Sequence, residues 1–310
     1  VGTRVNYQLS GSRSLFTSTA RKARNFEPPY KDAVLDADED WADPMLWRVM
    51  RSVSSAYTGD FYLAALDRER DVEGDIVQVR EERRVYLLLF QRTLIMSAVI
   101  TAICLVLAYP IAHLLATLPM AKSNLLMILV LLPFWTSLLV RTTSWIVLLQ
   151  SQGVVNDTLV ATGLVSDGNR IQMIYNQAGT IIAMTHILLP FMILPLYSVM
   201  RTINPSYVRA ARSLGATSWT AFRRVYLPQT VPGIGAGVLL VFILAVGYYI
   251  TPALVGGATG QLISNLIAFH IQDSLNWSLA AALASLLLGA VLILYWLYDR
   301  LVGIDNLKLG

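Results

Sequence analysis

Long apolar runs separated by short polar segments fill the chain from residue 86 onward. These runs lie at 86–110, 124–149, 174–200, 229–252 and 278–301. Each run reaches the roughly 20 residues that a helix needs to cross about 30 Å of hydrocarbon. Four prolines interrupt the runs (Pro133, Pro190, Pro195 and Pro232), which membrane helices tolerate when neighbouring groups satisfy the freed carbonyls. The pattern predicts an all-α polytopic membrane protein, with five transmembrane helices in this chain.

Residues 1–84 follow a different pattern. They contain no apolar run of spanning length, but aromatic residues are scattered through them. A disordered tail has fewer aromatic residues, so we expect a small, mostly helical lobe at 1–84 and a membrane domain at 85–305. One helix should open at Asp43-Pro44, because proline suits the first helical position. A short amphipathic stretch at 262–271 should either lie on the membrane interface or pack against the bundle.

Composition supports the membrane assignment and narrows the function. Hydrophobic residues make up 55% of the 310 positions and charged residues only 14%, against about 25% charged in a soluble domain. The one cysteine, Cys104, lies within an apolar run, so neither an internal disulfide nor a thiolate cluster is expected. No nucleotide-binding or metal-binding motif occurs. We therefore expect no cofactor in this chain and no nucleic-acid partner.

Lysine and arginine in the short loops indicate the orientation, because cytoplasmic loops carry the excess. One side holds Lys122, Arg201, Arg209, Arg212, Arg223, Arg224, Arg300 and Lys308; the other holds Arg80, Arg83, Arg84 and Arg170. Residues 201–228 and the C-terminus are therefore expected in the cytoplasm, with 1–84 outside the cell membrane. That topology requires a further transmembrane helix before Val1, making six. An inverted topology, with the lobe in the cytosol, is the alternative.

The basic segment 204–228 between the third and fourth runs has a pattern of its own. Asn204-Pro205 is typical of a helix start, and Gly215 of a left-handed helix stop. Thr217 or Ser218 should cap a second short helix that ends at Pro228. Leu214, Trp219, Phe222 and Val225 should form its apolar side and three arginines its polar side.

The spacing of this segment resembles the cytoplasmic signature of the permease subunits of bacterial ABC importers. That signature has Glu-Ala-Ala, then a glycine, then Ile-x-Leu-Pro, and here the matching residues are Ala210-Ala211, Gly215, Val225 and Leu227-Pro228. The stretches 131–149, 187–200 and 248–257 look like the spermidine/putrescine-type branch. The resemblance covers about residues 85–305 and implies six helices.

The resemblance also implies a function, partners and a site. The chain would be the membrane permease of an importer in the bacterial inner membrane, moving a small, polyamine-like solute. A separate ATP-binding subunit would hold ATP and Mg²⁺. An extracytoplasmic solute-binding protein would deliver the solute, and a second permease subunit would complete a hetero- or homodimer. The implied ATPase-coupling residues are Arg209, Ala210, Ala211, Leu214, Gly215, Ala216, Phe222, Leu227 and Pro228.

One departure from the signature concerns charge. Arg209 stands where the family has Glu, and either a compensating partner or solvent exposure of Arg209 would accommodate it. Trp135, Arg141, Tyr248 and Tyr249 are the candidates for the solute path, since aromatic faces attract cationic amines. No acid lies within a span, which argues against a strong cation site in this chain.

For several residues of the membrane domain, a purely structural role is the alternative to a functional one. Arg141 is either a functional cation or a snorkelling one, and the tyrosines and Trp135 are either path residues or interface anchors. Arg92 is expected to snorkel, and His186 to hydrogen-bond a neighbouring helix. An ion-coupled secondary transporter is the alternative function, although it would be expected to carry intramembrane acids.

Overall fold

The chain divides into two units, Val1–Val85 and Tyr86–Gly310. The computed structural model describes residues 2, 5–6, 9–54, 58–71 and 75–302. The described residues are mostly helical, as the apolar pattern predicts. The expected end of the membrane domain at 303–305 and the basic Lys308 lie outside the described residues.

The first unit is a set of short helices with a small hairpin. Its helices are α2 (Ser12–Lys22), α3 (Tyr30–Ala37), α4 (Pro44–Ser54) and α5 (Asp60–Ala65). Short 3₁₀ turns lie at Ala23–Asn25, Glu39–Ala42 and Glu81–Arg83. The strands β1 (Arg68–Arg70) and β2 (Ile76–Gln78) pair antiparallel, with Glu69 opposite Val77. The polar sequence of this hairpin offered no alternating pattern from which to predict it.

Trp41 lies at the centre of the small core of this unit. It packs with Val5, Leu15, Leu46 and Val49. Its indole N–H donates to Thr19 Oγ1 at 2.8 Å, so the buried ring leaves no unsatisfied donor. The predicted start of α4 is also present, since Asp43 Oδ1 accepts the Met45 N–H at 2.8 Å.

The second unit is a bundle of long helices with short helices between them. Its helices are α6 (Tyr86–Thr117), α7 (Met120–Leu131), α8 (Leu138–Leu149), α9 (Val154–Ala161), α10 (Gln177–Thr202), α11 (Ser206–Ser213), α12 (Ser218–Ala221), α13 (Leu227–Gly247), α14 (Ile250–Val255), α15 (Gly257–Gly260), α16 (Ile263–Gln272) and α17 (Trp277–Val302). Turns of 3₁₀ type lie at Leu132–Trp135 and Asp167–Asn169, and a π-helical turn spans Phe222–Tyr226.

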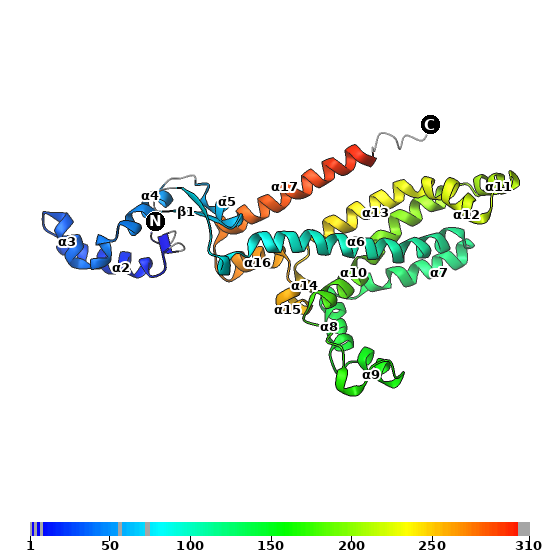
Figure 1. The fold of residues 1–310 in the computed structure, drawn as a ribbon, viewed down its shortest axis with the longest axis horizontal. Coiled ribbons are helices and arrows are strands. Elements are labelled where there is room, and N and C mark those ends of the chain that lie inside the picture. Colours follow the sequence, from blue (N-terminus) through cyan, green and yellow to red (C-terminus); the bar gives the residue numbers. More distant parts are fainter. Residues whose placement is uncertain (1, 3–4, 7–8, 55–57, 72–74, 303–310) are drawn as a thin grey trace. The chain divides into compact units, whose positions relative to one another are not determined.

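Helices α6, α10 and α13 pack side by side and form the core of the bundle (Figure 1). The buried side chains on these helices recur every four residues. Small ones line α6 (Cys104, Ala108 and Ala112), and larger ones line α10 (Met184, Leu188, Met192, Leu196 and Met200). On α13, Gly233 and Gly237 face α10, where an added Cβ would meet Pro195 O at 3.1 Å or Met192 Sδ at 2.6 Å. Small residues four apart permit this close packing in membranes, where apolar burial alone drives little association.

The predicted second span, 124–149, is not one straight helix. It is divided between α7 and α8, and the two halves are bent by 95° at a short break. The cause lies in the break itself: Pro133 sits in a 3₁₀ turn, Thr136 is extended, and Ser137 Oγ caps α8 by accepting the Val140 N–H at 3.2 Å. Among the described residues, four helices are long and apolar enough to span, or up to five if the bent pair counts as one.

The predicted boundaries of the fourth span, and the helix end at Pro228, are wrong. The helix begins earlier, at Ser218, and continues through Pro228 to Gly247. Pro228 lacks an N–H and would clash in a regular helix, but the preceding π turn changes the pairing, with the Leu227 N–H bonded to Phe222 O. The Gln229 amide also donates to Val225 O at 2.7 Å. The first span likewise extends past 110, to Thr117.

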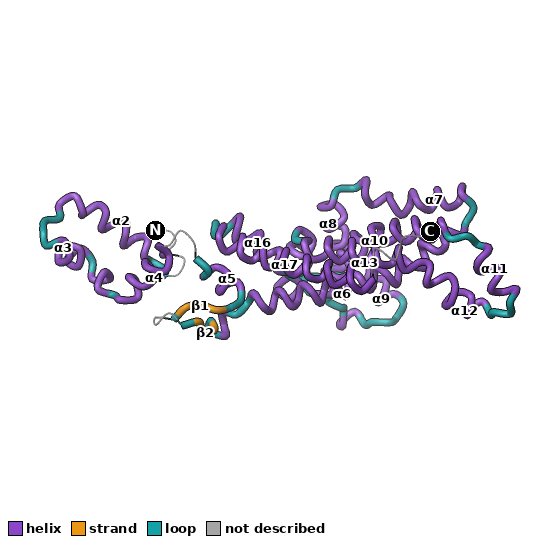
Figure 2. Tube along the Cα trace, turned by 90° about the horizontal axis from the view of Figure 1, so that it is seen from above, coloured by secondary structure: helices purple, strands orange, loops and turns teal. Residues whose placement is uncertain are grey.

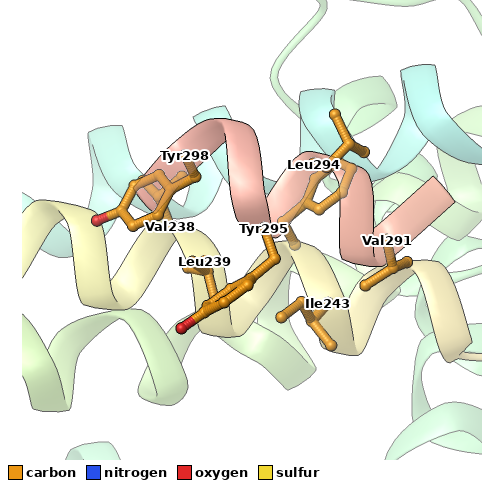
Figure 3. A pocket seen from close by; sticks show the side chains of 8 residues that line it. Val238, Leu239, Ile243, Val291, Leu294, Tyr295 and Tyr298 are labelled. Atoms are coloured by element: carbon orange, nitrogen blue, oxygen red, sulfur yellow. The ribbon is translucent and has the colours of Figure 1, made fainter. Parts of the chain in front are cut away.

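The amphipathic stretch at 262–271 forms α16 and packs inside the bundle. Leu262 and Ile263 are fully buried, and the Ile263 N–H donates to Thr93 Oγ1 on α6 at 2.8 Å. Helix α16 also contacts α17. Helix α17 in turn lies along α13, with an apolar groove between them lined by Leu239, Ile243, Val291 and Tyr295 (Figure 3).

Candidate functional site

The segment 204–228 folds as a small helical hairpin. Asn204 Oδ1 accepts the Ser206 N–H at 2.9 Å and so caps α11. Gly215 has φ +88°, the left-handed conformation that glycine adopts without strain. Thr217 then caps α12, accepting the Thr220 N–H at 3.2 Å. Three of the predicted turn features are therefore present, and Thr217 is the cap of the second helix.

The tip of this hairpin exposes large apolar side chains. Leu214 is 90% exposed, Trp219 67% and Tyr207 54%. Helices α11 and α12 lie together at one end of the bundle in both views (Figure 1, Figure 2). The two arginines of α11, Arg209 and Arg212, are also exposed. An apolar tip beside positive charges is suited to protein contact.

An aromatic ladder connects the tip to the bundle. Trp219 stacks on Phe222 at 5.7 Å between ring centroids, and Phe222 stacks on Tyr226 at 5.9 Å. Phe222 also meets Tyr109 and His113 of α6 edge-on. Phe222, one of the residues expected on the apolar side of the segment, is therefore half-buried against the bundle.

Two polar contacts fix the hairpin and its neighbours. His113 Nδ1 lies 3.0 Å from Tyr226 Oη, and Arg201 donates to Ala116 O, at the end of α6, at 2.8 Å. The sequence pattern indicated no partner for His113, because residue 226 is far away along the chain. The ends of α6 and α10 and the π turn of the hairpin are thus held together.

The remaining residues that the sequence assigned to ATPase coupling differ in their exposure. Ala210, Gly215 and Pro228 are exposed, whereas Ala211, Ala216 and Leu227 are half-buried. Arg209 is exposed, and its guanidinium makes no hydrogen bond or ion pair with any described residue. Exposure of Arg209 is compatible with both explanations, contact with solvent and a compensating partner.

A second cluster forms where two helices break. Arg141 lies in the first turns of α8, which begins after the 95° break. Tyr248 lies in the break between α13 and α14. Arg141 is close enough to interact electrostatically with both Tyr248 and His186 of α10. The Trp145 indole N–H donates to His186 Nδ1 at 3.2 Å, which matches the expected packing of His186 and adds Trp145, a residue that the sequence did not indicate.

Arg141 carries buried nitrogen atoms without partners. Its Nε and Nη1 are inaccessible to solvent and have no hydrogen-bond partner among the described residues. This half-buried side chain is compatible with both a functional cation and a snorkelling arginine, which differ in what Nε and Nη1 contact. Arg92 differs, since its Nη1 donates to Ala258 O at 3.1 Å.

The other proposed path residues are not all in this cluster. Tyr249 is next to Tyr248 and is 40% exposed, whereas Trp135 is 89% exposed. Trp135 lines a separate hollow at the bend between α7 and α8, with Ile128, Leu131, Leu132 and Thr136. Arg141 therefore interacts with Tyr248, whereas Trp135 is exposed and lines a different hollow.

The linker between α9 and α10 is held by polar side chains. Arg170 bonds Asp157 at 2.7 Å and Asp167 at 2.8 Å. The hydrogen bonds to Asp157 and Asp167 raise the pKa of the Arg170 guanidinium, which is charged at any physiological pH. Asn156 is fully buried and bonds both backbone groups of Ile171.

Known proteins resemble the chain in sequence. Residues 95–303 match the family described as "Binding-protein-dependent transport system inner membrane component". The chain is 36% identical over 222 residues to the spermidine/putrescine transport system permease protein PotB of Escherichia coli, covering 71% of this chain and 80% of that protein. PotB of Haemophilus influenzae is 38% identical over 216 residues, covering 70% of this chain and 75% of that protein.

A solved structure shares the fold. It is a bacterial ABC transporter involved in the import of the acidic polysaccharide alginate. It aligns with a TM-score of 0.63 at 16% identity, covering 91% of this chain and 100% of that one. The family match over residues 95–303 covers most of the bundle and includes both clusters described above. The chain belongs to the binding-protein-dependent transport inner membrane component family, and it is a multi-pass membrane permease subunit of an ABC importer rather than an enzyme.

Proposed function

We propose that this permease is coupled to a separate ATPase through residues 204–228 and moves a small, amine-bearing solute across a bacterial inner membrane. The names of the sequence relatives support a polyamine-like solute. The family description supports a solute-binding protein on the outer side. A second permease subunit completes the bundle, and ATP and Mg²⁺ are bound by the ATPase. No support exists for an ion-coupled secondary transporter.

The exposed tip of the hairpin is the observation that carries the coupling proposal. Leu214 and most of the Trp219 side chain are exposed, which costs free energy unless another surface covers them. The ladder from Trp219 through Phe222 to Tyr226 connects that tip to α6. A force on the tip therefore reaches the core of the bundle through packed rings, as switching between two states requires.

The proposed sidedness follows from the same segment. The ATPase works in the cytoplasm, so residues 201–228 and the C-terminus are cytoplasmic and residues 1–84 are extracytoplasmic. The exposed arginines of the hairpin, Arg209, Arg212, Arg223 and Arg224, agree with the positive-inside tendency. The solute path is assigned to the region of Arg141, Tyr248 and Tyr249, with Trp135 at its margin.

A charge at the tip tests the coupling proposal. In Leu214→Glu the acid would have to be desolvated at the contact with the ATPase, so we expect uptake by the complete importer to fall at least about tenfold. Solute-stimulated ATP hydrolysis should fall with it, while the thermal stability of the purified complex stays unchanged because Leu214 is exposed. Leu164→Glu is the matched control, since Leu164 is 75% exposed in the linker after α9. Equal uptake in both variants would refute the coupling role.

A further inference from the structure

Two of the three guanidinium nitrogens of the half-buried Arg141 are shielded from solvent, and the side chain has no counter-ion among the described residues. Nε and Nη1 have no hydrogen-bond partner in the described part of the chain. Transfer of an unpaired charge into a low-dielectric interior costs several kcal/mol. Such a charge is expected to meet an anion at some stage of the protein's work.

The acidic residues of this unit either form ion pairs with Arg170 or lie on the helices α16 and α17. Among residues 86–302 they are Asp157, Asp167, Asp273 and Asp299. Asp157 and Asp167 bind Arg170. Asp273 lies at the end of α16, and Asp299 is in the last turns of α17. The described chain therefore places no carboxylate against Arg141.

The surroundings of Arg141 favour negative charge further. The residue lies near the N-terminus of the 12-residue helix α8, where the helix dipole is positive. Because His186 Nδ1 accepts the Trp145 N–H, the proton of a neutral His186 is on Nε2, which is then a donor. These groups would bind an anion better than an ammonium group.

The position of the cluster points to the transported solute. Transporters bind solutes where spanning helices are broken, and Arg141 follows one break while Tyr248 lies in another. Side chains of α16 stabilise the second break: Ser264 Oγ donates to Tyr248 O at 2.6 Å, and Asn265 Nδ2 donates to Tyr249 O at 2.8 Å. Helix α8 packs on α10 and α14 there.

We propose that Arg141, assisted by His186, is the anion-recognising group of the translocation path, and that the solute carries a carboxylate as well as an amine. This inference rests on the proposed solute path and narrows the amine-bearing solute to one that also carries a carboxylate. A simple diamine offers two cations to a site that holds a cation already. An amino-carboxylate presents its carboxylate to Arg141 and its ammonium to the ring of Tyr248.

Two four-carbon probes separate these classes, namely 4-aminobutyrate and putrescine, which differ only in one end group. Thermal unfolding of the complete importer in lipid nanodiscs would be followed with each probe at millimolar concentration. We expect 4-aminobutyrate to raise the melting temperature by about 1–4 °C, and putrescine to leave it unchanged. The Arg141→Gln variant should lose this shift through an affinity at least about tenfold weaker, and Arg141→Lys should keep part of it.

Arg92→Gln is the matched control, because Arg92 is also a half-buried arginine of a spanning helix, and it should keep the full shift. A shift with putrescine alone, or with neither probe, would overturn the proposal. Release of the second permease subunit from Arg141→Gln, seen as a smaller complex on native gels, would also overturn it by assigning the counter-ion to that subunit. The Leu214→Glu test of ATPase coupling does not depend on any of these outcomes.

Discussion

His113 Nδ1 on α6 lies 3.0 Å from the hydroxyl oxygen of Tyr226 in the π turn. The two rings also meet edge-on, with centroids 5.0 Å apart. Tyr226 is the last residue of the π turn, and α13 begins at the next residue. The pair therefore joins the proposed coupling hairpin to the core of the bundle by both packing and a hydrogen bond.

Tyr226→Phe should weaken this connection without removing the ring. Loss of one hydrogen bond costs about 1 kcal/mol, so we expect solute uptake to fall a few-fold while basal ATP hydrolysis stays near its normal rate. The measurement is the ratio of solute molecules imported to ATP molecules hydrolysed in proteoliposomes. Tyr109→Phe is the control, because it removes the bond to Thr230 between α6 and α13 and leaves His113–Tyr226 intact. An equal drop in that ratio for both variants would contradict a specific role of Tyr226.

The apolar runs in the sequence predict most of the spanning helices, but the positions of prolines predict only in part where those helices break. Pro133 and Pro228 look alike in sequence, each within or beside an apolar run. Pro133 lies in a 3₁₀ turn followed by extended residues and a new helix cap, whereas Pro228 is absorbed by a π turn. The difference depends on which carbonyls find other donors, such as the Gln229 amide for Val225 O. The residues around the proline, rather than the proline itself, decide whether such a helix continues.

The candidate site was predictable where it depends on local turns. Asn204, Gly215 and Thr217 act on residues two or three positions away, so the sequence shows them directly. His113–Tyr226 and Arg141–His186–Tyr248 join residues that are far apart along the chain, and a single sequence does not indicate such pairs. The Gly233-x-x-x-Gly237 spacing was visible, and it is a signal of close helix packing that the sequence interpretation missed.

Arg209 should be replaceable. It is exposed and unpaired within the described chain, so Arg209→Ala should change the free energy of unfolding by less than about 0.5 kcal/mol. If Arg209 faces solvent in the assembled importer, uptake should also stay unchanged. A specific loss of uptake with normal stability would instead reveal an acidic partner on the ATPase, and Arg209→Lys should then restore part of the activity.

Removal of the charge at Arg141 should stabilise the protein in the absence of solute. An unpaired guanidinium with two buried nitrogens is costly, so Arg141→Met, which keeps the long side chain, should raise the free energy of unfolding by about 1 kcal/mol. The measurement is thermal unfolding of the purified permease complex without added solute. A large loss of stability would mean that Arg141 holds the bundle together through a partner subunit.

Asn156 should be essential to the linker between α9 and α10. Its side chain is fully buried and bonds the N–H and the carbonyl of Ile171 at 3.0 and 2.9 Å. Asn156→Ala removes both bonds, at a cost of about 0.5–1.5 kcal/mol each. Hydrogen exchange at residues 150–172 should accelerate, while Asn169→Ala, an exposed asparagine of the same linker, should change little. Equal exchange in the two variants would contradict the assigned role of Asn156.

The glycines of α13 should differ from a glycine of α17 in their tolerance of a methyl group. A Cβ on Gly235 would overlap the hydroxyl of Tyr298 on α17, which reaches α13 beside the groove of Figure 3. A Cβ on Gly233 would meet the backbone of α10. Gly233→Ala should therefore cost about 1–3 kcal/mol, because backbone cannot move aside, and Gly235→Ala should cost less, because the Tyr298 side chain can rotate away.

Gly289→Ala on α17 is the control: nothing lies within 4 Å of its Cβ position, so a stabilisation of about 0.5–1 kcal/mol is expected from helix propensity alone. Thermal unfolding in nanodiscs gives the three values, and the order Gly233, Gly235, Gly289 from most to least destabilised is the expected outcome. A reversed order would mean that α13 does not approach α10 through its glycine face.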